Sequence, residues 1–331
     1  MKRRRAGALA LLVLLLLPLC GCAPQADTRE IFAMDTVMEL TVYGSGAADR
    51  TRETAELLSG LEAKLSVTRA DSEVARLNAG KTVDLSKETA ELLRRSLRLR
   101  DETGGALEPF LYPLTRLWGF TTGDYRVPSD AEIAETLAGI RGGSYTLEGD
   151  TASLHGLALD FGAVAKGYAG QLAAERLRAA GVTSAILSLG GNVQTVGLKP
   201  DGSLWNVAIR DPEDPEGYLG VLAVGETAVV TSGGYQRYFE EDGVRYIHIL
   251  DPETGRPADT GLSSVTIVSA DGLLADGLST ALYVLGLDRA EALWRDRSDF
   301  EAVLVAKDGA IYVTAGLAEA FSGAEFQVIE R

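Results

Sequence analysis

The stretch LALDFGAVAKGYAGQLAAERLRAAGVTSAILSLGG, residues 157–191, carries the clearest secondary-structure signals in the chain. Its apolar start predicts a buried strand over 157–161. Helical periodicity follows over 164–180, and Gly181 stands where a helix commonly ends. An apolar run over 184–189 predicts another buried strand. The stretch therefore predicts strand, helix and strand in direct succession.

The regions on either side follow no regular order of strands and helices. Towards the N-terminus, we expect a half-buried strand at 36–43 and helices at 46–65 and 87–101. Towards the C-terminus, we expect several short strands, at 204–209, 228–231, 245–250 and 263–269. Two helices at 272–285 and 289–295 should follow them, and then two closing strands. This irregular order favours the α+β class over a repeat of βαβ units.

The N-terminus has the order of parts found in a secretory signal. Basic residues at 2–5 precede an uncharged apolar run at 6–19, which is shorter than the roughly 20 residues of a spanning helix. The run ends in Leu-Cys-Gly-Cys at 19–22, which resembles the lipobox that is cleaved before a lipidated cysteine. An ordinary cleaved signal and a short N-terminal anchor are the alternatives.

The lipobox resemblance predicts a signal peptide at 1–21, lipidation of Cys22 and a polar tether over 22–30. We therefore expect a lipid-anchored protein of the cell membrane that faces the extracytoplasmic side. Its body would have no disulfide, thiolate metal site or cysteine nucleophile, because the chain's two cysteines both lie in this N-terminal segment.

The charge of the chain restricts its partners. The formal net charge is −15, and it becomes −19 when the four basic residues of the signal peptide are removed. Such a body is repelled by the phosphates of nucleic acids and by anionic lipid head groups, so we expect no nucleic-acid partner. A phosphate ligand would need a metal ion or a local cluster of backbone donors.

The first segment with chemical potential is DFGAVAKGYAG, which begins at Asp160. It places an acid near the end of a strand and Lys166 in the helix that follows, where free backbone N–H groups and the helix dipole suit an anion. The segment lacks the partner motifs of a protein kinase and the spacing of a Walker A loop. A capped turn with a solvated lysine explains it equally well.

The second segment, SLGGNVQTVG at 188–197, has paired glycines that allow close backbone approach, although a plain tight turn also explains them. The third contains TSGGYQRY at 231–238 and YIHILDPETGRP at 246–257. His248 in this third segment precedes a strong turn signal, and a structural histidine is the alternative to a catalytic one. His155, the other histidine, is expected at the surface.

The fourth segment is ADGLSTALYVLG, residues 275–286. Asp276 and Thr280 are four residues apart, so they project from one face of the predicted helix. A carboxylate and a hydroxyl on one face suit a hard cation such as Mg²⁺, which prefers oxygen ligands. Helix capping by Asp276 is the alternative.

These segments, in this order, resemble the ApbE family of FAD:protein FMN transferases. The resemblance covers about 31–323 and includes three further motifs: AMDTVMELTVYG at 33–44, SVTRADSEVARLN at 66–78 and GALEPFLYPLTRLWGF at 105–120. It implies one large domain over 31–331, of mixed, mainly antiparallel strands with packed helices, similar to a T-fold.

The resemblance also implies an activity. Members bind FAD as substrate together with Mg²⁺, and they transfer FMN to a threonine or serine hydroxyl of an acceptor protein with release of AMP. Acceptors in this family are largely membrane redox subunits. With water as the acceptor, the same site would act as an FAD pyrophosphatase. A lipid-anchored FAD-binding protein without turnover and a solute-binding receptor are the further alternatives.

The family motifs assign roles to individual residues. Asp276 and His248 match catalytic positions, with His248 as the base near the transferred phosphate. The metal would be bound by the Ala163 carbonyl, Asp276 and Thr280, with Ser279 close by. Further residues match positions that bind FAD: Met34, Thr68, Ala106, Leu107, Glu108, Asp160, Lys166 and Leu250.

Three positions depart from the family pattern. Asp35 replaces the glycine of the common Met-Gly-Thr motif, so we expect this turn to differ in geometry from that of the family. Thr68 replaces an aromatic residue that often stacks on the flavin, so weaker flavin affinity is expected. Glu108-Pro109 replaces Asp-Pro, which makes the side chain one methylene longer.

Overall fold

The computed structural model describes residues 25–214 and 216–331. The expected signal peptide at 1–21 and Cys22 lie outside this part of the chain. Within it, every helix is too short or too polar to cross a bilayer.

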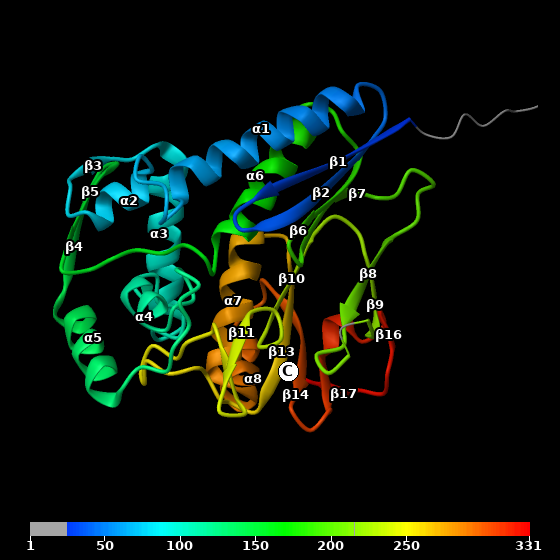
Figure 1. The fold of residues 1–331 in the computed structure, drawn as a ribbon. Helices are drawn as coiled ribbons and strands as arrows, with labels where there is room; N and C mark the ends of the chain where they lie inside the picture. Colours follow the sequence, from blue (N-terminus) through cyan, green and yellow to red (C-terminus); the bar gives the residue numbers. More distant parts are fainter. Residues whose placement is uncertain (1–24, 215) are drawn as a thin grey trace, which may run out of the picture.

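A large mixed sheet forms the centre of the molecule (Figure 1). In the described part of the chain it has nine strands, which pair antiparallel except for β15 and β17. In spatial order the strands are β1 (Ala26–Ala33), β2 (Thr36–Tyr43), β6 (Ser184–Leu189), β7 (Asn192–Gly197), β10 (Ala228–Gly233), β13 (Leu262–Ser269), β14 (Glu301–Ala306), β15 (Ile311–Thr314) and β17 (Gln327–Ile329).

The two faces of this sheet carry different layers. Helices cover one face and bury the main apolar core: α1 (Ala47–Leu65), α6 (Ala165–Ala179), α7 (Gly272–Leu285) and α8 (Leu287–Arg295). The other face packs against a small sheet in the order β16 (Phe321–Gly323), β9 (Tyr218–Val224) and β8 (Trp205–Arg210). Because strand residues alternate between faces, Val229 of β10 joins the second core and Val230 the first.

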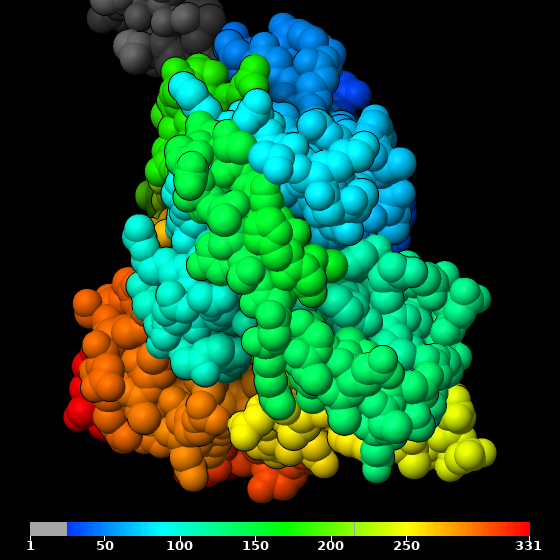
Figure 2. Space-filling view, turned by 90° about the vertical axis from the view of Figure 1, so that its left-hand side faces the viewer, coloured from blue at the N-terminus to red at the C-terminus, as the bar shows by residue number. Residues whose placement is uncertain are grey.

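A lobe of short elements lies beside the helical layer, and Figure 2 shows it from the outside in cyan, teal and green. Its elements are α2 (Glu73–Asn78), β3 (Val83–Asp84), α3 (Lys87–Glu102), α4 (Tyr112–Leu117), α5 (Asp130–Gly142), β4 (Ser144–Glu148) and β5 (Thr151–His155). The hairpin of β11 (Tyr238–Glu241) and β12 (Val244–Ile247) packs its aromatic side chains against this lobe.

The α+β prediction is confirmed. The bounds of the strands at 36–43 and 184–189 and of the helix at 272–285 agree with the structure residue for residue. These segments have strong periodicity, and each is buried on the side that its pattern indicates.

Three expectations need correction. Residues 157–161 are extended but form no strand, because Leu159 exchanges its backbone hydrogen bonds with the Asn78 side chain. The predicted tether at 22–30 is too long, since β1 begins at Ala26 and pairs with β2 along its whole length. The strand expected at 245–250 ends at Ile247, so His248 lies directly after β12.

Helices α6 and α7 make the closest helix contact in the helical layer. A Cβ added to Gly167 would lie 2.0 Å from the Gly272 carbonyl oxygen and 2.5 Å from the Asp276 Cβ. Reciprocally, a Cβ on Gly272 would lie 2.4 Å from the Gly167 carbonyl oxygen. Only glycines at these two positions allow the backbones to come together, and this contact places Asp276 against the first turn of α6.

We expect Gly167→Ala to destabilise the protein by about 2–3 kcal/mol or more, because the methyl group forces the two helix backbones apart. Gly60→Ala is the matched control. Gly60 is an exposed glycine within α1 with open space around its Cα, and alanine there should stabilise by about 0.5–1 kcal/mol. Urea unfolding of both variants measures the difference, and equal stability of Gly167→Ala and wild type would contradict the close-contact argument.

Candidate functional site

Asp276 is the buried acid at the centre of the candidate site. It lies in the second turn of α7 and is 3% exposed. Its Oδ2 accepts a hydrogen bond of 2.7 Å from the backbone N–H of Gly167 in the first turn of α6. The N-cap of its own helix is Asp271, whose side chain accepts from the Leu274 N–H. Asp276 therefore caps the neighbouring helix and not its own.

The Ala163 carbonyl is available beside this cap. Val164 is the N-cap of α6, and its carbonyl accepts the first bond of the helix, from the Tyr168 N–H at 3.0 Å. Ala163 precedes the N-cap, so its carbonyl has no partner within the helix, and among the described residues no backbone N–H donates to it. A carboxylate and a free carbonyl oxygen thus meet at the N-terminus of α6.

Two hydroxyls of α7 extend this oxygen-rich site. Ser232 on β10 approaches both, at 2.8 Å from Ser279 Oγ and 3.2 Å from Thr280 Oγ1. Ser279 also donates to the Asp276 backbone carbonyl at 2.7 Å and is fully buried. Thr280 retains some exposed surface. Thr280 is therefore the hydroxyl better placed to bind a ligand, and Ser279 supports it.

The chemistry of these groups fits a hard cation. Burial raises the pKa of Asp276, while the nearby Lys166 charge and the Gly167 N–H act in the opposite direction. Among the described residues no cationic side chain forms an ion pair with this carboxylate, and no group of three or more His, Cys, Asp or Glu side chains is arranged to hold a metal ion. A buried acid without an ion pair, beside a carbonyl and hydroxyls, suits Mg²⁺ better than a soft metal.

Lys166 supplies positive charge to the same region. It lies on the first turn of α6 and electrostatically lowers the pKa values of Asp160, Asp276 and His248. For Asp160 this effect opposes burial, which raises the pKa of the carboxyl group. Asp160 also accepts the Gly162 N–H at 2.8 Å and so closes the turn before α6. The ammonium group and the helix N-terminus together can hold an anion.

The hydrogen bonding of His248 determines its tautomer. Its Nδ1 lies 3.0 Å from the Arg237 carbonyl oxygen. A carbonyl can only accept, so Nδ1 must carry the proton, and Nε2 is the basic atom of the neutral ring. Burial of the imidazole lowers its pKa to about 4, and the charges of Lys166 and Arg237 contribute to this shift.

Arg237, which sequence analysis did not single out, connects three parts of the site. Its backbone carbonyl accepts two hydrogen bonds from His248, one from Nδ1 at 3.0 Å and one from the backbone N–H at 3.1 Å. Its guanidinium donates to the Phe120 carbonyl at 2.5 Å and lies 3.3 Å from the Asp35 carboxylate. The only sequence signal was its position in the TSGGYQRY segment.

The predicted FAD positions fall in different surroundings. Met34 and Asp35 form the β1–β2 turn with φ of 50° and 62°. Asp35 thus adopts the left-handed conformation that glycine would favour, and the turn is retained. Leu107 packs against α7 at Gly277, which brings the Ala106–Glu108 loop to the helix of Asp276.

Three other predicted FAD positions, Glu108, Leu250 and Thr68, make their recorded contacts with neighbouring residues and not with Asp276 or His248. Burial raises the pKa of Glu108, whose side chain accepts the Phe110 N–H at 3.0 Å. Leu250 is buried and forms an isolated bridge with Pro257. Thr68 is exposed in the α1–α2 loop, where its backbone N–H and hydroxyl both bond to Ser66.

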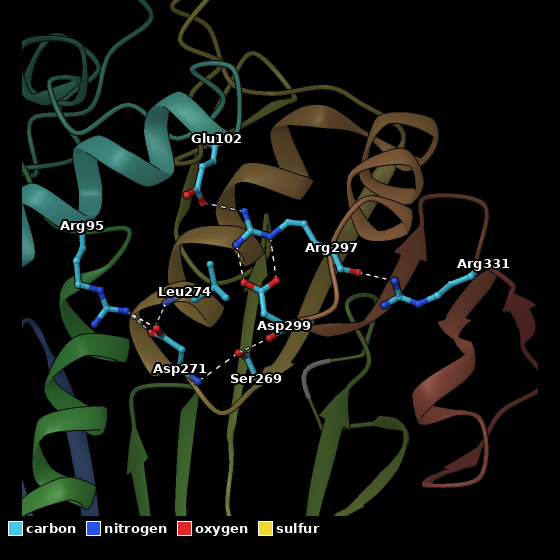
Figure 3. A network of polar contacts seen from close by, with 8 residues as sticks. All are labelled: Arg95, Glu102, Ser269, Asp271, Leu274, Arg297, Asp299 and Arg331. Atoms are coloured by element: carbon cyan, nitrogen blue, oxygen red, sulfur yellow. Dashed lines mark hydrogen bonds and ion pairs between the residues drawn. The ribbon is translucent and has the colours of Figure 1, made fainter.

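A polar network fixes the beginning of α7 (Figure 3). Arg95 of α3 binds the Asp271 N-cap, with 2.5 Å between Nη2 and Oδ1. The Asp271 N–H donates to Ser269 Oγ, which in turn donates to the Asp299 carbonyl. Arg297 then joins Asp299 to Glu102, so α3 is attached to both ends of this network. The helix that carries Asp276 is therefore held by the lobe as well as by α6.

Two pockets flank the β11–β12 hairpin, with volumes of about 580 and 550 Å³. Tyr235 and Arg245 line both of them. Neither lining, among the described residues, includes Asp276 or His248. These two residues therefore lie outside both pockets.

Comparison with known proteins agrees with the resemblance found in the sequence. The model of the ApbE family matches residues 34–304. The FAD:protein FMN transferase of Vibrio cholerae is 35% identical over 295 residues, covering 84% of this chain and 87% of its own. That of Treponema pallidum is 34% identical over 336 residues, covering 91% and 92%.

Solved structures show the same relationship. The ApbE protein of Thermotoga maritima has a TM-score of 0.83 at 30% identity, covering 89% of this chain and 99% of its own. The flavin transferase ApbE of Vibrio cholerae has a TM-score of 0.80 at 29% identity, covering 90% and 100%. A variant of the latter with a histidine replaced by glycine has also been solved.

We expect the imidazole of His248 to titrate well below 6.5, near pH 4, with the proton on Nδ1 in its neutral form. Because the pKa is lowered in the folded protein, the ring stays neutral as the pH falls from 7 to about 5. The unfolded chain binds the proton first, so the free energy of unfolding falls as the pH drops from about 6.5 to 4. NMR of a His155→Gln variant, which leaves one histidine, measures both properties. A pKa near 6.5 or a proton on Nε2 would contradict the assignment.

Proposed function

This chain belongs to the ApbE family, and we propose that it transfers FMN from FAD to a hydroxyl group of an acceptor protein at the site around Asp276 and His248. The observation that carries this proposal is the tertiary cap of α6 by Asp276. It brings a buried carboxylate, a free carbonyl and two hydroxyls to a helix N-terminus, next to Lys166 and His248.

The proposed reaction is a substitution at phosphorus. The oxygen of an acceptor threonine or serine hydroxyl forms a bond to the FMN-side phosphorus of FAD. The bond from that phosphorus to the bridging oxygen breaks, and AMP leaves with this oxygen. The hydroxyl proton passes to His248, whose Nε2 is the free basic atom because Nδ1 is bound to the Arg237 carbonyl.

The site can bind a pyrophosphate although the protein as a whole is acidic. The positive end of the α6 dipole and the Lys166 ammonium are local anion-binding groups. Asp160, held by the Gly162 N–H, lies within the electrostatic reach of the same lysine. These groups orient the phosphates, while Arg237 keeps His248 facing them.

The ligand set further supports Mg²⁺ as the ion of this site. The Ala163 carbonyl, Asp276 and Thr280 would bind it, and Ser279 would position Thr280 and the α7 backbone. A bound Mg²⁺ stabilises negative charge on the phosphate oxygens during transfer. The buried acid, which has no cationic partner among the described side chains, is the main reason to expect an ion here.

Two alternative functions share this site. Water in place of the acceptor hydroxyl would make the protein an FAD pyrophosphatase that yields FMN and AMP. An FAD-binding protein without turnover would need neither the base nor the cation. The free Nε2 of His248 favours turnover, since a binding protein has no need of a base beside the phosphates.

The location of the protein is also part of the proposal. Lipidation at Cys22 would attach it to the extracytoplasmic side of the cell membrane, where membrane redox subunits would be the acceptors. Because β1 begins at Ala26, at most about 14 Å of extended chain would separate the lipid from the folded body. The enzyme would then search a surface at raised effective concentration.

We expect a mixture of the protein, FAD, Mg²⁺ and a threonine-bearing acceptor to increase the acceptor's mass by one FMN and to release AMP in equal amount. Asp276→Ala should abolish this turnover, because it removes the only acidic ligand and the α6 cap together. Its folding is checked by circular dichroism. AMP without modified acceptor would indicate the hydrolase, intact FAD would indicate binding alone, and full activity of Asp276→Ala would exclude the proposed cation site.

For the anchor, we expect wild-type protein expressed in a bacterium to fractionate with membranes and to carry a lipid mass on its N-terminal cysteine. Cys22→Ser should move the protein to the soluble extracytoplasmic fraction without changing FMN transfer in detergent-free extracts. Cys20→Ser is the control that should remain lipidated. Membrane association of Cys22→Ser equal to wild type would exclude the lipid anchor.

A further inference from the structure

Asn192 is a buried amide with an unsatisfied donor. The residue is 4% exposed, and its Nδ2 makes no hydrogen bond to any residue in the described part of the chain. An unpaired buried donor costs about 1–3 kcal/mol. Such a group calls for an explanation beyond folding stability.

The backbone places Asn192 at the edge of the candidate site. The turn of Gly190 and Gly191, with φ of 62° and 95°, joins β6 to β7, and Asn192 is the first residue of β7. It pairs with Leu189 on one side and with Val230 on the other. Its position in the interior of the sheet is therefore fixed by strands on both sides.

The side chain of Asn192 lies beneath the contact between α6 and α7, as its neighbour on the same face shows. Gln194, two residues further along β7, has its Oε1 3.3 Å from the Cβ position of Gly272 on α7 and its Cβ 3.3 Å from that of Gly170 on α6. A step of two residues along a strand spans about 6.8 Å, and a step of four along a helix about 6 Å. Asn192 acts on Asp276, so these two steps lead in the same direction from the contact of Gln194 with Gly272.

The electrostatics of Asp276 agree with this placement. Asn192 is one of the groups that favour the charged carboxylate, after Lys166 and the Gly167 N–H. The amide lies beside the carboxylate, although its Nδ2 does not yet form a hydrogen bond of normal geometry.

We propose that Asn192 is a positioning residue of the cation site, whose Nδ2 donates to the Asp276 carboxylate when the ion is bound. The Gly167 N–H holds Oδ2 from the α6 side, and Asn192 holds the carboxylate from the sheet side. Two donors on different elements stop rotation of the carboxylate and orient it towards the ion. Groups of this kind typically change metal affinity about 10–100-fold. The inference rests on the proposed cation site.

Gln194 provides a matched control. It lies on the same strand and the same face, is 6% exposed, and also has one unsatisfied atom, Oε1. Its Nε2, however, donates to the carbonyls of Thr195 and Thr227 at 3.2 Å, so its role is within the sheet. Leucine at either position changes the size and polarity of the side chain in a similar way.

The experiment measures Mn²⁺ binding by electron paramagnetic resonance, with saturating FAD, in wild type, Asn192→Leu, Asn192→Ala, Gln194→Leu and Asp276→Ala. We expect the two Asn192 variants to bind Mn²⁺ at least tenfold more weakly. Their FAD affinity should be unchanged, and their melting temperature should be unchanged or higher. Gln194→Leu should keep its Mn²⁺ affinity within twofold and lose thermal stability. If the Asn192→Leu variant does not fold, the Mn²⁺ affinity of Asn192→Ala decides the test.

Wild-type Mn²⁺ affinity in both Asn192 variants would overturn the role of Asn192 and leave the cation site intact. An equal loss in Gln194→Leu would also overturn it, because the effect would then come from general disturbance of β7. Unchanged binding in Asp276→Ala, or no binding in wild type, would instead show that the proposed cation site is wrong. The two failures are therefore distinguishable.

Discussion

The contact between the backbones of α6 and α7 is the constraint on which the site depends. Gly167 and Gly272 lack side chains where the two helices meet, and each would place a Cβ within 2.4 Å of the opposite carbonyl oxygen. At this separation Asp276 reaches the first turn of α6 and accepts the Gly167 N–H. The Ala163 carbonyl precedes the N-cap of the same helix and has no helical partner. The packing of the two helices thus brings a buried carboxylate to the helix end that carries a free carbonyl.

The remaining elements bring complementary groups to this helix pair. The sheet contributes Ser232 beside the α7 hydroxyls, and the lobe fixes the start of α7 through Arg95 and Asp271. The β11–β12 region contributes His248, whose tautomer is set by the Arg237 carbonyl. Ser232 comes from a strand and Arg95 from a helix, while His248 lies directly after β12 and is held by the Arg237 carbonyl. Such support orients the groups of a site.

The local charges are opposite to the charge of the whole molecule. A body with a formal charge of −15 or below repels a pyrophosphate at long range. Lys166, the α6 N-terminus and Arg237 bring positive charge to one place, where Asp160 and Asp276 are the acids that burial affects. Selectivity for a phosphate ligand then comes from short-range contacts, which salt screens less than the net charge.

Sequence alone determined the α+β class, the family, and the bounds of segments with strong periodicity, such as β2, β6 and α7. It also identified Asp276, Thr280, Lys166 and His248, because motifs and helical spacing are local properties of the chain. Tertiary structure decided which partners these residues meet. Asp276 caps a helix 109 residues away, and Leu159 pairs with Asn78 in place of a strand. The tautomer of His248 likewise depends on a carbonyl in another strand connection. These contacts join segments distant in sequence, and local periodicity carries no information about which distant donor will meet a given acceptor.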